Sequence, residues 1–202
     1  MFKFDENVEV AKLDVSDKEA LLGCYNATIN SAFISTTENN KYMLELEFDV
    51  IDNNTGEIKK QFVKEYFANE DKEPYNNGKN GKFPTSGLRV IKSIAEIINA
   101  DYKQLVNNTI SKIIERFGKK DEVLIINIPM IEVFVGFEPN IYNGNIKPVI
   151  SFVFGKNELT DEQKNKKCKA LNNKNEKILK ESSENKKETN KGNSSQNKYG
   201  WS

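Results

Sequence analysis

The chain has 202 residues, enough for one domain with a core and an appendage, and its 30 basic residues balance its 30 acidic residues. It contains no histidine, which excludes imidazole-based catalytic triads, His-ligated zinc and the usual general base near neutral pH. Residues 156–202 carry 12 lysines against 7 acidic residues, whereas residues 1–155 carry 18 basic against 23 acidic residues. An acidic body is therefore followed by a basic tail.

Three strands are predicted in the first third of the chain. Apolar and polar residues alternate over residues 24–34 and 42–50, which is typical of strands with one buried face. The segment DNNTGE (52–57) supplies Asn and Gly after the second strand and so predicts a hairpin turn. The chain then returns as a third strand over residues 58–67.

A helix is expected after residue 85, because the apolar period changes there from that of a strand to that of a helix face. Thr85 or Ser86 is placed to cap its first turn. The apolar residues of this face stand at i, i+3, i+4 and i+7: Ile91, Ile94, Ala95 and Ile98.

A second helix over residues 108–118 and two apolar strands, around 123–136 and 147–154, complete the predicted body. The order strand–strand–strand–helix–strand–strand is the connectivity of an OB-fold, a five-stranded, partly open barrel whose helix lies between the third and fourth strands. The sequence therefore predicts a mainly β chain with inserted helices, of the α+β class and the OB-fold type, over residues 1–155.

Residues 156–202 are predicted to form a flexible, polar and largely disordered C-terminal tail. Lys, Asn, Glu and Ser dominate it, and its apolar residues are too sparse to bury a core. Thr160 and Gln163 have the spacing of a capping box, so a solvated helix is expected over about residues 161–181.

Cys24 and Cys168 lie far apart in the sequence, which indicates neither a disulfide framework nor a metal site. Such cysteine usage fits a reducing cytosol. The most apolar stretch, residues 123–137, is too short for a membrane span and is interrupted by polar residues and a proline. Residues 1–10 lack the apolar segment of a secretion signal. We therefore expect a cytoplasmic protein that uses no membrane, metal or cofactor.

The segment YNNGKNGKFPTSGLRVIK (75–92) invites several interpretations. A Walker phosphate loop fails, because the glycine spacing is wrong and Phe83 stands where Ser or Thr is needed. The segment could also be a simple connector over the surface. A metal nuclease would instead use the neighbouring turn, with Asp52, Glu57 and Lys59, but these residues also describe a polar hairpin tip.

Binding of single-stranded nucleic acid requires cations that follow the phosphates and exposed rings on which bases stack. Residues 75–92 supply both, with glycines that let the segment follow a flexible strand. The predicted phosphate contacts are Lys79, Lys82, Arg89 and Lys92, and the predicted stacking rings are Tyr75 and Phe83.

The third strand offers a second set of contacts, because alternation places three suitable residues on one face: Lys60, Lys64 and Tyr66. The two lysines could equally pair across the hairpin with carboxylates of the second strand, at Glu45, Glu47 and Asp49. The sequence leaves both interpretations open.

The chain resembles phage-encoded single-stranded-DNA-binding proteins of the OB-fold type in three segments: YNATINSAFIS, the YMLELEFDV hairpin with its NNTGEI turn, and YNNGKNGKFPTSGLRVIKSIAEI. The resemblance covers roughly residues 20–155. It implies sequence-independent binding and protection of single-stranded DNA in phage DNA replication or recombination, inside the cytoplasm of an infected bacterial cell and without catalysis. It further implies replication or recombination proteins as partners of the tail. Such proteins usually end in an acidic tail with a terminal aromatic, whereas this tail is basic and ends in YGWS.

Two other functions compete with this interpretation. The first is a non-enzymatic phage protein-interaction or assembly module, in which the acidic body docks on a partner and the tail tethers it. The second is a metal-dependent nuclease at Glu57-Ile58-Lys59.

Overall fold

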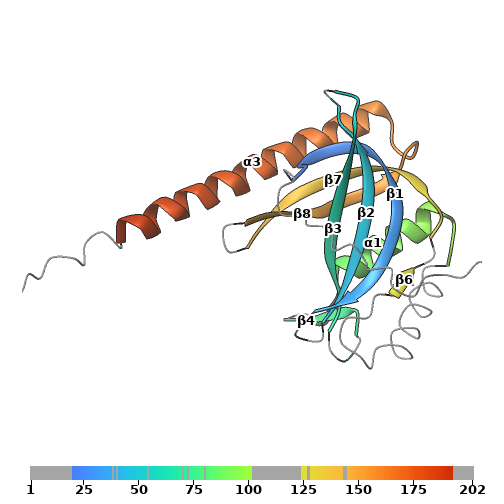
Figure 1. Ribbon diagram of the computed structural model, residues 1–202, viewed down its shortest axis with the longest axis horizontal. Coiled ribbons are helices and arrows are strands. Elements are labelled where there is room, and N and C mark those ends of the chain that lie inside the picture. Colours follow the sequence, from blue (N-terminus) through green and yellow to red (C-terminus); the bar gives the residue numbers. More distant parts are fainter. Residues whose placement is uncertain are drawn as a thin grey trace, which may run out of the picture.

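The computed structural model describes residues 20–37, 39, 41–53, 55–69, 71, 73–79, 81–101, 124–126, 128–142 and 145–192. This part of the chain is mainly β, with one curved antiparallel sheet, a small hairpin and two helices (Figure 1). In chain order the elements are β1 (Gly23–Thr36), β2 (Tyr42–Ile51), β3 (Ile58–Ala68), β4 (Tyr75–Gly78), β5 (Gly81–Pro84), α1 (Ser86–Ile97), β6 (Leu124–Ile126), β7 (Ile131–Tyr142), β8 (Asn145–Gly155) and α3 (Asp161–Gly192).

Strand β1 joins the two halves of the sheet, whose order is β3-β2-β1-β7-β8. Along one edge β1 pairs with β2, and along the other it pairs first with β7 over residues 23–29 and then with β6 over residues 32–34. The register of β1 against β2 shifts between Ile29 and Ser31, close to the point where the other edge changes partner. A bulge at this position bends the strand and increases its twist, which helps to curl the sheet.

The two edge strands, β3 and β8, face each other across a seam. No strand pairing joins them within the described residues. Instead, the side chain of Glu65 in β3 accepts a hydrogen bond from the backbone N–H of Ile150 in β8, at 2.6 Å. Helix α1 lies against both strands beside this seam. The sheet is therefore strongly curved but not closed.

The core lies inside the curve of the sheet and is closed at one side by α1. Strict alternation in β2 buries every second residue, with Leu44, Leu46, Phe48 and Val50 fully enclosed. Helix α1 is fixed by Thr85, as predicted: its hydroxyl accepts from the N–H of Leu88 at 3.2 Å and donates to the carbonyl of Phe67 at 2.8 Å. The same residue thus caps the helix and attaches it to β3.

The predicted strands at 24–34, 42–50 and 58–67 are confirmed as β1, β2 and β3, and the predicted mainly β, α+β class is confirmed. The expected strand at 123–136 is divided into β6 and β7, and the one at 147–154 begins earlier, as β8. The finer prediction of a five-stranded OB barrel stays a prediction. The helix expected at 108–118 lies outside the described residues.

Helix α3 corrects the prediction of a largely disordered tail. It runs over Asp161–Gly192, beyond the expected end near residue 181, and its first half lies against β7 and β1 (Figure 1). Its start has the predicted capping box, in which the N–H of Thr160 donates to the Gln163 side chain at 2.9 Å and the N–H of Gln163 donates to the Thr160 hydroxyl at 3.3 Å. Leu171, only 4% exposed, shows why the prediction was wrong: few apolar residues suffice when the sheet supplies the apolar partner surface. Residues 193–202 lie outside the described residues.

A disulfide between Cys24 and Cys168 joins the start of β1 to α3, with the two Cα atoms 5.6 Å apart. The prediction from the sequence, that these cysteines form no disulfide framework, was therefore wrong. The two residues are 144 positions apart. Only the docking of α3 on the sheet brings them together, and the polar composition of the tail did not predict that docking.

Candidate nucleic-acid interface

Residues 75–84, expected as a loop, form a hairpin of the two short strands β4 and β5. Its register pairs Tyr75 with Pro84 and Asn76 with Phe83. Residues directly opposite in an antiparallel pair share a face, and successive residues alternate faces. Tyr75 and Phe83 therefore lie on opposite faces of the hairpin, where they are 44% and 49% exposed.

The Phe83 ring lies across the hairpin over Gly78. A Cβ atom added at Gly78 would stand only 3.0 Å from that ring, so glycine at this position makes room for it. Gly81 has a φ of +112°, in the region that favours glycine, and returns the chain into β5. The glycines of this segment thus shape a tight hairpin and hold an exposed aromatic ring.

The four cations predicted to contact phosphates differ in their surroundings. The ammonium group of Lys82 lies 2.8 Å from the carboxylate of Glu73, and that of Lys92 lies 3.9 Å from Glu96 on the same helix. Lys79 and Arg89, both exposed, form no ion pair with another residue in the part of the chain that the structure describes. These two cations are the most readily available to an anionic ligand.

The cross-strand pairing considered for the β3 lysines is confirmed. Lys64 pairs with Glu45 at 2.7 Å, and Lys60 pairs with Glu47 and, at 3.9 Å, with Asp49. These pairs are solvent-exposed and contribute little to stability, so phosphates could still compete for the lysines. The half-buried Tyr66 follows on the same strand face, and burial raises the pKa of its hydroxyl.

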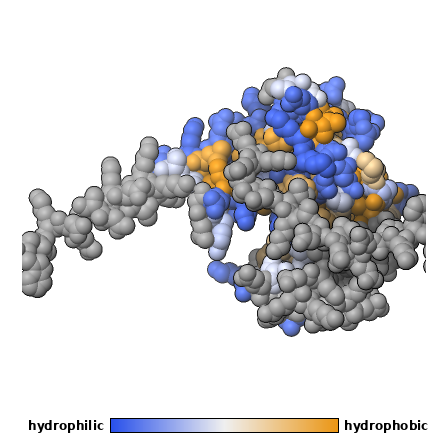
Figure 2. All heavy atoms as spheres, in the orientation of Figure 1, coloured by the Kyte–Doolittle hydropathy of each residue, from blue (hydrophilic) through white to orange (hydrophobic). Residues whose placement is uncertain are grey.

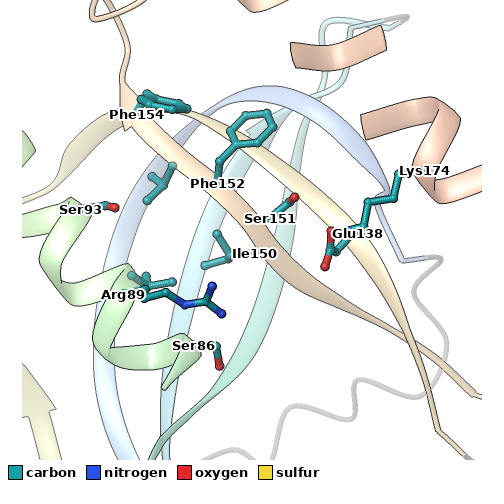
Figure 3. Close-up of a pocket in the computed structure, with 11 residues that line it drawn as sticks. Ser86, Arg89, Ser93, Glu138, Ile150, Ser151, Phe152, Phe154 and Lys174 are labelled. Carbon is teal, nitrogen blue, oxygen red and sulfur yellow. Dashed lines mark hydrogen bonds and ion pairs between the residues drawn. The ribbon is translucent and has the colours of Figure 1, made fainter. Parts of the chain in front are cut away.

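A groove of about 380 Å³ runs between α1 and the free edge of β8 (Figure 3). Arg89 reaches into it from the first turns of α1, and Figure 3 shows Glu138 and Lys174 on the opposite side. Lys174 and Glu138 pair with each other at 2.6 Å. The hydroxyl groups of the groove come from Ser86, Ser93 and Ser151.

Glu65 lies buried next to this groove, at the seam between β3 and β8, with 3% of its surface exposed. Burial raises the pKa of its carboxyl group, while the hydrogen bond from Ile150, the hydroxyl of Ser86 and the charge of Arg89 lower it in part. Arg89 thus faces the groove, and its charge also lowers the pKa of the Glu65 carboxyl group in part.

The β7–β8 hairpin contributes further exposed residues that sequence reasoning missed. Tyr142 is 68% exposed and Ile146 is 44% exposed, and Lys147 next to them is exposed without an ion-pair partner in the described part of the chain. The available signal was the Asn-Gly pair at 143–144, a typical hairpin turn sequence, which places the flanking residues at a hairpin end. The two strands were predicted around residues 123–136 and 147–154, so Tyr142 and Ile146 lay outside both of them.

The two hairpins project from the same side of the curved sheet, β4–β5 at its lower end and β7–β8 above, on the left of Figure 1. Figure 2 shows hydrophobic residues (orange) and hydrophilic residues (blue) together on the described part of this face. Exposed aromatic rings therefore stand on both hairpins, and Arg89, which has no ion-pair partner among the described residues, lies on the helix that follows the first hairpin.

Two of the residues considered for a nuclease site, Asp52 and Lys59, make contacts that hold the hairpin turn together. The Asp52 carboxylate accepts from the N–H of Thr55 at 3.3 Å and pairs with Lys59 at 2.5 Å, and Gly56 turns the chain with a φ of +72°. The described residues hold no group of three His, Cys, Asp or Glu side chains placed to bind a metal ion. Within the same residues, no helix has the length and apolar character to span a membrane.

No protein-family model matches this chain, and no curated protein sequence matches it significantly.

Proposed function

We propose that this chain binds single-stranded DNA without sequence preference and protects it during replication or recombination of phage DNA, in the cytoplasm of an infected bacterial cell. It catalyses no reaction. The observation that carries the proposal is the pair of projecting hairpins with exposed aromatic rings at Tyr75, Phe83 and Tyr142, beside cations that lack an ion-pair partner in the described chain, at Lys79, Arg89 and Lys147. Rings for stacking and free cations for phosphates are the two requirements of single-strand binding.

We also propose that the curved sheet is an OB barrel. The strand order β3-β2-β1-β7-β8 supports this, because the first strand lies between the second and the fourth long strand, and α1 lies between the third and the fourth along the chain. OB-folds bind oligonucleotides with the face of strands 2 and 3 and with the loops after strands 1 and 4. The β7–β8 hairpin has the place of that second loop, and Lys60, Lys64 and Tyr66 belong to that face.

Stacking and phosphate contacts of this kind do not distinguish one base from another, because every base has a flat aromatic face. The proposed binding therefore covers strands of any sequence. Replication or recombination proteins are proposed as partners of the C-terminal segment, as the resemblance in sequence implies.

Substitutions of two similarly exposed residues, one at the end of β7 and one just before its start, test the proposed interface. Tyr142 (68% exposed) ends β7, whereas Met130 (72% exposed) precedes its start, about 40 Å away along a 12-residue strand. We expect Tyr142→Ala to weaken binding of fluorescent oligo-dT at least fivefold, since one stacked ring is lost. Met130→Ala should leave the affinity unchanged. Equal effects of the two substitutions would remove the β7–β8 hairpin from the interface.

A protein-interaction module remains the second candidate, because apolar residues are exposed at the opposite hairpin. Ile51 and Ile58 pair across β2 and β3 and are 46% and 69% exposed. Substitution of both by Ser should leave oligo-dT binding intact if DNA is the ligand. Loss of a protein partner upon this change, in a chain that does not bind oligo-dT, would favour the interaction module.

A further inference from the structure

Three phenylalanine rings form a continuous ladder on the outer face of β7 and β8. Phe134 and Phe154 are opposite in the register, with Phe152 two residues along β8. The ring centroids are 5.8 Å apart between Phe134 and Phe152 and 5.6 Å apart between Phe152 and Phe154. Gly136 lies beneath the Phe152 ring, where an added Cβ would stand 2.6 Å from it.

This ladder adjoins the groove that holds Arg89. Phe152 and Phe154 line the groove together with Arg89, and Figure 3 shows their rings projecting from β8 on the side away from α1. A DNA strand bound in the groove would therefore contact Phe152 and Phe154, the two rings of the ladder that line the groove.

Helix α3 covers the ladder with cations. The ammonium group of Lys164 lies 5.5 Å from the centroid of Phe134, and that of Lys167 lies 4.6 Å from Phe154 and 5.5 Å from Phe152. Both lysines stand over ring faces, the surfaces on which a base would stack. Phe134 is buried, whereas the other two rings are half-buried.

The disulfide lies in the same part of α3 as these two lysines. Cys168 follows Lys167 directly and stands one helical turn after Lys164 and one turn before Leu171. C-terminal to Cys168, the contacts of α3 with the sheet include the buried side chain of Leu171, a hydrogen bond from the Asn175 side chain to the carbonyl of Phe137 at 3.0 Å, and the exposed pair Lys174–Glu138. The covalent bond is thus the strongest single link between α3 and the sheet.

We propose that the ladder Phe134–Phe152–Phe154 is a second base-stacking surface, that α3 covers it, and that reduction of the Cys24–Cys168 disulfide uncovers it. This inference rests on the proposed single-strand binding and names its redox regulation. Both cysteines are half-buried, so a small thiol can reach them.

The chemical step is thiol–disulfide exchange. A dithiol attacks the Cys24–Cys168 bond as its thiolate, the S–S bond breaks through a mixed disulfide, and the second thiol of the reagent completes the exchange. The protein gains two thiols, whose protons come from the dithiol, and the reagent becomes a cyclic disulfide. A reducing cytosol favours the reduced form, in which α3 leaves the ladder. Oxidising conditions restore the disulfide and return α3 to the ladder.

The test compares the full-length protein, oxidised and treated with dithiothreitol, in titrations of fluorescent oligo-dT. We expect roughly tenfold tighter binding after reduction, the effect of one or two newly stacked bases. The variant Cys168→Ser should bind like the reduced protein and ignore the reagent. Phe154→Leu, which keeps an apolar side chain but loses the ring, should lose the gain. Hydrogen exchange of the α3 amides gives a readout that needs no DNA, and protection should fall on reduction.

The outcomes separate this inference from the proposed function. If oxidised protein binds oligo-dT and reduction changes neither affinity nor α3 protection, only the inference is wrong. Release of α3 without a gain in affinity also overturns it, because the ladder then does not stack on bases. If neither form binds oligo-dT, the proposed function fails and the second stacking surface fails with it.

Discussion

Tyr75 and Phe83, the two rings of the β4–β5 hairpin, lie on opposite faces of it, because the register sets Tyr75 against Pro84 and Phe83 against Asn76. A single base cannot be sandwiched between them. If both rings bind, each must stack on a different nucleotide, with the hairpin inserted between the two.

This arrangement predicts additive effects. Tyr75→Ala and Phe83→Ala should each weaken oligo-dT binding by about 1–3 kcal/mol, and the double variant should show the sum to within about 0.5 kcal/mol. Because both rings are about half exposed, each substitution should change the free energy of unfolding, measured by thermal melts, by no more than about 0.5 kcal/mol. A loss of about 3–5 kcal/mol of stability with unchanged affinity would identify a core residue instead.

The salt dependence of binding should identify the phosphate contacts. Lys79→Ala and Arg89→Ala should each flatten the plot of log affinity against log salt concentration by roughly 0.7, since neither cation has an ion-pair partner in the described chain. Lys156→Ala is the matched control and should leave the slope unchanged, because Lys156 pairs with Glu132 at 2.6 Å and is not among the proposed contacts. An unchanged slope for Arg89→Ala would remove the groove from the interface.

Burial of Glu65 predicts a pH-dependent stability. Because its pKa is raised in the folded state, the folded protein binds the proton more tightly than the unfolded chain does. The stabilising contribution is therefore complete below the ordinary value of 4.5 and is lost as the pH rises through the raised pKa. Glu65→Gln keeps an oxygen for the N–H of Ile150 and carries no charge, so it should raise the melting temperature at pH 7 and have little effect at pH 4.

Glu65→Ala provides the control for this experiment. It removes the acceptor as well as the charge, leaves the N–H of Ile150 without its partner at the seam, and should cost about 1–3 kcal/mol. A Glu65→Gln protein that loses stability at pH 7 but not at pH 4 would show that the charge itself holds the seam.

Close packing of α3 on the sheet requires glycine at position 136. An added Cβ would stand 2.6 Å from the Phe152 ring and 2.8 Å from Leu171, so Gly136→Ala should cost about 1–3 kcal/mol in thermal melts. Gly155→Ala, in the neighbouring strand, is the matched control, because its nearest neighbour would be 3.6 Å away. Equal melting temperatures for the two variants would contradict the described contact of α3 with β7.

Local sequence signals predicted the part of the fold that depends on local physics. Alternation gave β1, β2 and β3, and Thr85 was identified as a cap because a hydroxyl before an apolar helix face satisfies a free backbone N–H. The β4–β5 hairpin was missed because its residues are polar, glycine, proline or exposed aromatic, so no buried face produces alternation.

Long-range contacts could not be predicted in the same way. The bond between Cys24 and Cys168 depends on where α3 packs on the sheet. That packing relies on the contact between Gly136 and Leu171, two single residues that produce no periodic pattern in the sequence. For the candidate site, six cations and three aromatic rings were identified from their residue types. Their free or paired state, such as that of Lys82 with Glu73, follows only from the folded geometry.

The measurement that tests single-strand binding most directly is fluorescence anisotropy of labelled oligo-dT and of duplex DNA of equal length, with and without magnesium, followed by a gel of the DNA. Only unpaired bases can reach the rings on the two hairpins, so we predict at least tenfold tighter binding of oligo-dT than of duplex, with the DNA intact in magnesium. Equal affinity for both, or no binding of oligo-dT at modest salt, would contradict the account, and a ladder of cleavage products would replace it with a nuclease.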